Sequence, residues 1–314
     1  MFYDFLVGLP PFGYAYNFDN YLFNKARHLN TQGIEQREDY FLVHEFKKRI
    51  EGKIHFLIEG NKAYSPYRSL FGSFEMNPQM GINLLSKFIT FILEDLEKKG
   101  VKEIFITHSA AGYHQVKSHK VHEALTRSGF NVSREAVNHH IPIDEAMLDL
   151  KMHAMERRRL AKCRGEGLEF LSVAPGDFNR VYDYIEACRA EKDLKPSVSR
   201  EKMGNYLEMF PQDYLMFAVQ KDGEIYAATI AIKVNRKVLY NFLPGSLERY
   251  GTLSPMVMLV EGLYEYCRGR NYDILDLGIS TLPEGEHQES LIAFKEHMGG
   301  EKSIKMSYFL RRDA

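Results

Sequence analysis

The sequence predicts an α/β protein with mixed α+β sheets, arranged as two tandem domains. Segments with helical spacing of apolar residues alternate with short apolar strands. The order strand, loop, long helix, strand, short helix, glycine occurs twice along the chain. The 314 residues suffice for two domains of ordinary size. Because antiparallel hairpins precede the strand–helix–strand unit, neither domain is expected to be a plain doubly wound sheet.

The first copy of this order runs from an apolar strand, through an aromatic-rich stretch, into a long amphipathic helix. Glycine follows both of its helices and stops the helical pattern. Its expected elements are a strand at 53–59, an extended stretch at 60–76, a helix at 82–100, a strand at 102–109 and a helix at 114–130.

The second copy contains a hairpin, because Asp222-Gly223 between two apolar runs is a strong turn signal. A basic segment at 144–167 is expected to form a helix that links the copies. We therefore expect a first domain over residues 1–160, ending in the linking helix, and a second over 161–314. The further expected elements are strands at 168–174, 214–222, 224–234, 237–243, 272–278 and 302–310, and helices at 178–190, 254–270 and 288–300.

Composition favours a soluble cytoplasmic protein. The formal net charge of -1 gives no overall field that would attract DNA or anionic lipid. Cys163, Cys188 and Cys267 lie far apart without a CxxC pair, which is typical of free thiols in a reducing compartment. The N-terminus does not begin like a signal peptide, and no apolar run reaches the ~18 residues that suggest a membrane span. We expect no membrane span and no DNA partner.

The histidines do not form a metal-binding motif. His119 and His122 share a helix face at i, i+3, but no HExxH motif and no carboxylate at a fixed spacing accompanies them. A ligand set needs a geometry that these spacings do not supply. We expect no metal site.

Short motifs in the second half carry a family resemblance. Ser254-Pro255 stands at a helix start, Asp276-Leu277-Gly278 at a strand end, and Phe294-Lys295 shortly before Gly299-Gly300. With these motifs the chain resembles the FemAB-like transferases of the GNAT acyltransferase superfamily over about residues 168–310, and over the first half by element order alone. The resemblance implies two tandem GNAT-like (acyl-CoA N-acyltransferase) domains.

The resemblance also implies an activity. It is N-acyl transfer, in which an acyl or aminoacyl group moves from acyl-CoA or aminoacyl-tRNA to the amine of a small molecule or peptide, a cell-wall precursor among the candidates. No tightly bound cofactor is implied. The basic run at 155–164 would suit RNA phosphates, but the near-zero net charge favours a solvated helix face, so tRNA is not the favoured partner. The alternative function is a non-catalytic GNAT-like protein that binds a ligand or partner.

The loop before the helix at 254–270 is the expected carrier site. Family members hold the pyrophosphate of coenzyme A with a Gln/Arg-x-x-Gly-x-Gly/Ala loop. Here Arg249-Tyr250-Gly251 places the glycine one position early, which argues against ordinary acetyl-CoA binding. Ser254 is expected to cap the helix, so that free backbone N–H groups face an anion. The expected carrier-binding residues are Gly251, Ser254, Met256 and Val257. A plain capped helix is the structural alternative.

Asp276 and Asn241 are the expected catalytic residues. Acyl transfer to an amine needs a neutral amine and a stabilised oxyanion. It needs no nucleophilic serine or cysteine, in keeping with the absence of a GxSxG motif. Asp276 ends an apolar strand and Asn241 precedes the loop, and ligands of α/β sheets gather at the carboxyl ends of strands. The alternative for Asp276 is a carboxylate that caps the following turn.

Four further residues are expected to bind substrate. Tyr67, Arg68 and Ser69 belong to an unusual stretch at 64–75, which would line a cleft if it formed an extended strand. Lys295 lies among apolar neighbours, from which it would reach a phosphate or carboxylate. The alternatives are an aromatic edge strand and a lysine whose stem covers the surface.

Overall fold

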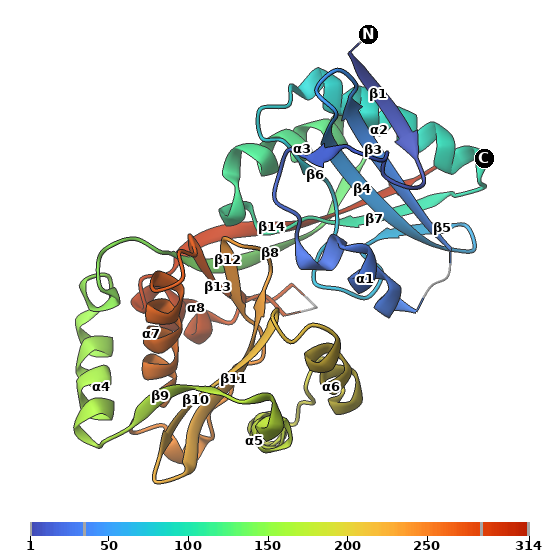
Figure 1. Cartoon of the computed structure of the whole chain (residues 1–314). Helices are drawn as coiled ribbons and strands as arrows, with labels where there is room; N and C mark the ends of the chain where they lie inside the picture. Colours follow the sequence, from blue (N-terminus) through green and yellow to red (C-terminus); the bar gives the residue numbers. More distant parts are fainter. Residues whose placement is uncertain (1, 34–35, 283–284, 313–314) are drawn as a thin grey trace. The chain divides into compact units, whose positions relative to one another are not determined.

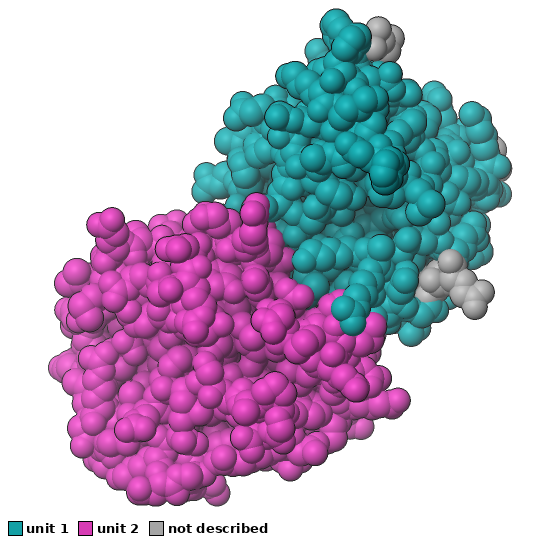
Figure 2. All heavy atoms as spheres, viewed as in Figure 1, with its two compact units in different colours: residues 1–137, 283–286, 303–314 teal, residues 138–282, 287–302 magenta. Residues whose placement is uncertain are grey.

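The computed structural model describes residues 2–33, 36–282 and 285–312. The chain forms two compact units, shown in Figure 2. Unit 1 contains residues 1–137, 283–286 and 303–314, and unit 2 contains residues 138–282 and 287–302. Each unit combines helices with part of one mixed sheet, so the predicted mixed α/β architecture is confirmed.

The units divide at residue 137 rather than at the expected residue 160. Strand β8 (Asn131–Pro142) is one continuous strand that begins in unit 1 and ends in unit 2. The expected linking helix is α4 (Ala154–Gly165), which lies inside unit 2. The final strand β14 (Glu301–Arg311) returns to unit 1, where Ser307–Arg311 pair with β7. The boundary between the units falls inside a continuous strand, where no turn residue marks it. The sequence therefore predicts the boundary at the next helix along the chain.

The described strands form one continuous sheet, whose part in unit 1 has the order β1-β3-β4-β5-β7-β14 followed by the first half of β8. Helices α2 and α3 pack on one face, where Phe88, Ile89 and Ile92 of α2 are buried against Tyr40 and Phe56. The elements are β1 (Tyr3–Val7), β2 (Ala15–Tyr16), α1 (Ala26–Leu29), β3 (Arg37–His44), β4 (Arg49–Glu59), β5 (Lys62–Ser65), β6 (Glu75–Met76), α2 (Ile82–Lys98), β7 (Glu103–Thr107) and α3 (Gln115–Arg127).

In unit 2 the same sheet continues with the strand order β8-β13-β12-β11-β10-β9. Figure 1 shows α4 and α7 on one side of these strands and α5 and α6 on the other. Only the β12–β13 pair is parallel among the ladders of this unit that join described residues. The remaining elements are β9 (Glu169–Val173), α5 (Phe178–Ala190), α6 (Arg200–Met209), β10 (Tyr214–Lys221), β11 (Glu224–Lys233), β12 (Val238–Asn241), α7 (Pro255–Arg268), β13 (Ile274–Ile279) and α8 (Glu289–His297).

Two local features show how the sequence produces unit 2. Asp222 and Gly223 both have positive φ, 49° and 80°, as a tight hairpin between β10 and β11 requires, and the predicted turn is confirmed. On α7, Gly262 lets the ring of Phe170 lie against the helix backbone, because a Cβ at residue 262 would fall 2.2 Å from a ring carbon. This close approach joins α7 to the edge strand β9.

The three cysteines are buried free thiols, as expected. No helix in the described part of the chain has the length and apolar character needed to cross a membrane.

Candidate functional site

The parallel strands β12 and β13 separate at a defined point. They pair only where Val238–Tyr240 lie beside Ile274–Asp276. Beyond this point the chain after β12 stays with β11, since the N–H groups of Phe242 and Leu243 both donate to the Ile230 carbonyl. Strand β13 instead continues beside β8, up to the Ile279–Asn138 pair. The carboxyl ends of two parallel strands therefore diverge, which is where ligands of α/β sheets gather.

The two expected catalytic residues both lie at this divergence, but on opposite faces of the sheet. Asp276 is paired with Tyr240 on β12 and with His140 on β8, so these three side chains share one face. Asn241 follows Tyr240 directly and therefore points to the other face. The sequence indicates that both residues lie at the carboxyl ends of strands. It does not show that their side chains point to opposite faces of the sheet.

Asp276 is buried and held by two donors. Its Oδ1 accepts hydrogen bonds from the Asn138 amide nitrogen at 2.9 Å and from the Gly278 N–H at 2.8 Å. The second bond bridges a bulge at which Gly278 has φ 76°. A side chain at Gly278 would meet the Tyr240 ring at 3.0 Å, so glycine serves both the bulge and the packing. Asp276 thus does cap the following turn, while also remaining part of a buried polar cluster.

His140 lies beside Asp276, and no motif in the sequence singles it out. It is 5% exposed, and its Nδ1 has no hydrogen-bond partner within the described residues. Burial lowers the pKa of His140, while the carboxylates of Asp276 and Glu301 act in the opposite direction. A histidine with a lowered pKa is neutral at neutral pH and is able to accept a proton. Finding it required the register between β8 and β13, for which the local sequence has no signal.

The neighbouring His139 points to the opposite face of β8. Both of its ring nitrogens are buried without a hydrogen bond to any described residue, and the nearest Glu296 oxygen is 3.7 Å from Nε2. Burial is again the main cause of a lowered pKa, followed by the nearby ammonium of Lys295. His139 and His140 are therefore similarly buried, but their side chains point to opposite faces of β8.

Asn241 makes one hydrogen bond that fixes its amide orientation. Its Oδ1 accepts from the Thr229 hydroxyl at 2.7 Å on the adjacent strand β11. Since the oxygen is used in this way, the amide nitrogen is the group through which Asn241 would act as a donor.

Lys295 of α8 is buried, not spread over the surface. Its Nζ donates to the carbonyl oxygens of Gly278 at 2.8 Å and Ile279 at 3.0 Å, and to the Ser280 hydroxyl at 2.9 Å. These three contacts match the three donors of an ammonium group. Burial lowers the pKa of Lys295 to about 8, and the nearby Asp276 carboxylate opposes the shift. Lys295 thus fastens the end of β13 to α8 and places a positive charge beside the site.

The loop before α7 differs from the expected anion cradle. Ser254 has φ 53° and ψ 53°, and its side chain does not cap the helix. An N-cap normally has extended backbone, which directs its oxygen at the first amides. The Ser254 hydroxyl instead donates to the Gly251 carbonyl at 3.0 Å. The expectation that Ser254 caps α7 is therefore wrong.

The N–H groups around Ser254 are only partly available. The Val257 N–H donates to the Ser254 carbonyl at 3.0 Å. The Met256 N–H has no acceptor within the described residues. Gly251 has an ordinary φ of -54°, so its backbone does not require glycine, although a Cβ there would approach the Glu248 carbonyl to 3.1 Å.

Most of the preceding loop satisfies its own backbone. The Glu248 N–H donates to the Glu191 carboxylate at 2.9 Å, and the Leu247 N–H to the Tyr184 hydroxyl at 3.3 Å. The N–H groups of Gly245, Tyr250, Gly251, Leu253 and Ser254 bind backbone carbonyls. The Glu191 carboxylate, which lies against the loop, and the occupied amides both disfavour a bound pyrophosphate.

The strained conformation of Ser254 gives a testable difference. Both Ser254→Gly and Ser254→Ala remove the bond to Gly251, but only glycine adopts positive φ without strain. We expect the glycine variant to exceed the alanine variant in free energy of unfolding by about 1 kcal/mol in urea titrations. Equal losses in both variants would contradict the left-handed conformation.

The stretch at 64–75 belongs to unit 1 and is not the expected strand. Strand β5 ends at Ser65, bends follow, and strand conformation returns only at Glu75, where β6 begins. Pro66 has no N–H to donate, and the next two N–H groups, of Tyr67 and Arg68, both donate to the Gln32 side chain. The guanidinium of Arg68 lies 4.8 Å from the centre of the Tyr67 ring. The hydroxyl of Ser69 is buried without a partner in the described structure.

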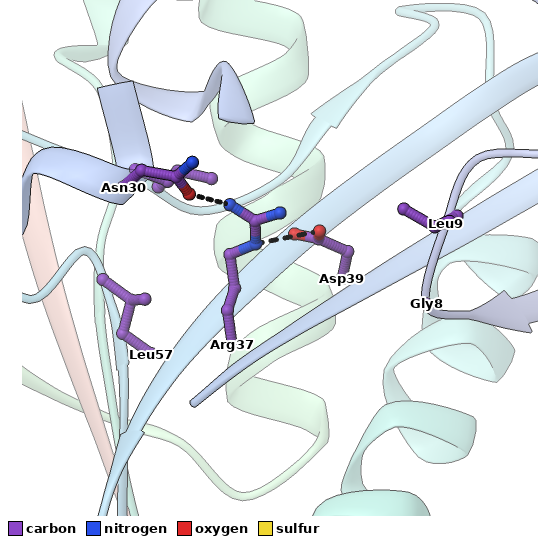
Figure 3. A pocket seen from close by; sticks show the side chains of 7 residues that line it. Gly8, Leu9, Asn30, Arg37, Asp39 and Leu57 are labelled. Atoms are coloured by element: carbon purple, nitrogen blue, oxygen red, sulfur yellow. Dashed lines mark hydrogen bonds and ion pairs between the residues drawn. The ribbon is translucent and has the colours of Figure 1, made fainter. Parts of the chain in front are cut away.

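A separate cavity of about 300 Å³ lies in unit 1 (Figure 3). Arg37 points between two partners, donating to Asn30 Oδ1 at 2.8 Å and to the Asp39 carboxylate at 3.0 Å. Burial raises the pKa of Asp39, and the Arg37 charge opposes the shift. These polar groups satisfy one another, so the cavity shows no unmet polar demand.

The basic run on α4 is largely paired within unit 2. Its side chains bind backbone carbonyls and carboxylates, which leaves less charge for RNA phosphates. The bonded side chains are Arg157 with Met152, Arg159 with Glu156, Lys162 with Thr252 and Arg164 with Glu261. Among residues that the structure describes, no group of three or more His, Cys, Asp or Glu is arranged to hold a metal ion.

Comparison with known proteins places this geometry in a family context. The family model described as an acetyltransferase (GNAT) domain matches residues 151–288, which include β12, the loop, α7 and β13. No curated protein matches the chain.

Solved structures share the fold of the whole chain. FemX is similar with a TM-score of 0.72 at 12% identity, over 93% of this chain and 92% of FemX. The C-terminal domain (DUF2156) of a putative lysylphosphatidylglycerol synthetase from Agrobacterium fabrum has a TM-score of 0.54 at 15% identity, over 82% of this chain and 81% of that one. A tandem GNAT protein from the clavulanic acid biosynthesis pathway has a TM-score of 0.50 at 12% identity, over 89% of this chain and 84% of that one. The likeness to these structures shows the tandem GNAT-like fold.

Proposed function

We propose that this FemAB-like chain, which has the tandem GNAT-like fold and an acetyltransferase (GNAT) domain at residues 151–288, transfers an acyl or aminoacyl group from a carrier to an amine. The observation that carries the proposal is the divergence of β12 and β13 inside the matched domain, with Asp276 and His140 buried side by side on one face. Fold similarity alone would not assign an activity.

His140 is proposed as the general base. The attacking amine must lose a proton as its nitrogen bonds to the acyl carbon, and a neutral imidazole can accept that proton. Asp276 orients the site and stabilises the imidazolium that forms. Because the pKa of His140 is lowered from its usual 6.5, transfer should remain undiminished at pH 7 and fall only in more acidic solution, as His140 becomes protonated.

Lys295 is proposed to act through local charge. Asn241 points to the face opposite His140, so it is not proposed to contact the acyl carbonyl on the His140 face. Lys295 contributes a fixed charge, since protein oxygens already occupy its donors. The carrier then leaves as a thiol or a ribose hydroxyl, taking a proton from the solvent or from protonated His140.

The carrier is proposed to contact Gly251, Ser254, Met256 and Val257 through a smaller surface than a pyrophosphate cradle offers. The occupied loop amides and Glu191 speak against coenzyme A held in the ordinary way. The paired basic run on α4 speaks against an extended RNA contact there. Tyr67, Arg68 and Ser69 lie in unit 1, and no role in the transfer chemistry of unit 2 is proposed for them.

A transfer assay tests the proposal. The full chain is incubated with acetyl-CoA, longer acyl-CoAs or mixed aminoacyl-tRNAs, and with amine acceptors that include lysine peptides and cell-wall precursor peptides. Mass spectrometry should detect a new amide on one acceptor with at least one donor class. Binding of a donor or acceptor without any product would instead support the alternative, a non-catalytic binding protein.

A further inference from the structure

A second cavity of unit 1 lies where strand β7 ends. Its volume is about 260 Å³. Strand β14 forms one wall through alternate residues, and α3 forms another. Its lining residues are His108, Ser109, Ala111, Gln115, Ser118, His119, His122, Ile304, Met306 and Tyr308.

Three lining side chains have buried polar atoms that no described residue satisfies. They are Nε2 of His108 and the hydroxyl oxygens of Ser109 and Ser118. The exposed fractions of these residues are 3%, 2% and 8%, so bulk solvent does not satisfy these atoms freely. Buried polar groups are almost always hydrogen-bonded, and three exceptions around one cavity indicate a missing partner.

The position of His108 is fixed from behind. The Nδ1 atom of its ring is 2.9 Å from the Ser73 hydroxyl, and its backbone N–H donates to the Met306 carbonyl at 3.0 Å. Ser73 is held in turn, because its N–H donates to the Ser65 hydroxyl at 2.9 Å. The unusual stretch at 64–75 thus supports an imidazole whose remaining nitrogen has no partner among the described residues.

None of the residues that line the cavity is Asp, Glu, Lys or Arg. Burial lowers the pKa of His108 to about 3, so its imidazole is neutral at neutral pH. A charged ligand would lose its hydration without gaining a carboxylate, ammonium or guanidinium partner in the lining. Ile304 and Met306 add an apolar wall beside the three polar groups.

We propose that this cavity binds an uncharged, hydroxyl-bearing ligand of about monosaccharide size. Serine hydroxyls both donate and accept, and the neutral imidazole contributes one further bond, which matches the hydroxyl groups of a polyol. The cavity is slightly smaller than the ~300–1,000 Å³ of drug-sized ligand sites, which limits the ligand to a small molecule. This site lies within unit 1 and is independent of the transfer chemistry proposed for unit 2.

Ligand-observed NMR with matched sugars tests the proposal on the full chain. Glucose and N-acetylglucosamine are the neutral probes, and glucosamine and glucuronate are charged probes of similar size. We expect at least one neutral probe to bind, and the charged probes to bind at least tenfold more weakly. Failure of both neutral probes to bind, or tighter binding of a charged probe, would overturn the proposal.

Serine variants tie binding to this cavity. Ser109→Ala and Ser118→Ala each remove a hydroxyl that no described residue binds, so we expect at least fivefold weaker binding with no fall in Tm. Ser128→Ala is the matched control, because this serine lies just after the end of α3 and its hydroxyl donates to the Ala124 carbonyl at 2.8 Å. It should lower Tm slightly and leave binding unchanged. Lower Tm in the two cavity variants, with no loss of sugar affinity, would show that ordered water alone satisfies the hydroxyls.

Discussion

Replacing Lys53 by methionine is expected to lower the free energy of unfolding by about 3–5 kcal/mol, because it leaves a buried carboxylate unpaired. The Lys53 Nζ lies 2.9 Å from a carboxylate oxygen of Glu75, whose side chain is 1% exposed. The same ammonium donates to the Asn24 carbonyl at 3.1 Å. Urea denaturation of the single variant measures the loss.

A double variant separates the charge from the packing. Lys53→Met combined with Glu75→Gln removes both charges and keeps an acceptor for the Tyr21 N–H, which binds Glu75 in the native chain. We expect the double variant to recover at least half of the stability that Lys53→Met loses. If the two substitutions were additive, the ion pair would not be the source of the loss.

Replacing Lys295 by methionine is expected to change how stability depends on pH. Its pKa is lowered from 10.5 to about 8 in the folded chain, so the unfolded chain binds more protons between these values. For this group, stability therefore rises with pH across that window. The free energy of unfolding of the wild type, relative to that of the variant, should therefore rise by about 1.4 kcal/mol per pH unit between pH 8 and pH 10.

Urea titrations at pH 7.5, 8.5 and 9.5 measure this difference. Taking the difference from the variant cancels the tyrosines and cysteines that also titrate in this range. Lys237→Met is the matched control for loss of a lysine, because Lys237 is half exposed and pairs with Asp273 at the surface. A constant difference between wild type and Lys295→Met over this range would show that the ammonium is not desolvated.

Much of the fold follows from local signals in the sequence. The Asp222-Gly223 turn and the apolar faces of α2 and α7 are local features, so periodicity and turn chemistry locate them. The continuous strand β8 and the return of β14 to unit 1 depend on pairing between distant segments. No residue pattern inside β8 marks the passage from one unit to the other, which is why the predicted boundary fell at 160.

The candidate site was predictable only in part, for a related reason. Asp276 stands out because it ends an apolar strand. His140 becomes significant only through its register with Asp276, 136 residues away in the sequence. The roles of Ser254 and Lys295 depend on backbone conformation and burial. A serine before proline suggests a cap whether or not its φ is positive. A lysine among apolar residues is equally typical of a side chain whose stem covers the surface.

The central claim is that amine acylation takes place on the face of β13 that carries Asp276 and His140. Its most direct test is the single-turnover transfer rate at pH 7 of His140→Gln compared with His139→Gln. The two histidines are adjacent, buried and on opposite faces of β8. If the two variants have the same Tm, a difference in their transfer rates does not come from a difference in folding. Loss of a general base should slow His140→Gln by about 10²–10⁴-fold, while His139→Gln should stay close to wild type. Equal rates in the two variants, or a larger loss in His139→Gln, would contradict the account.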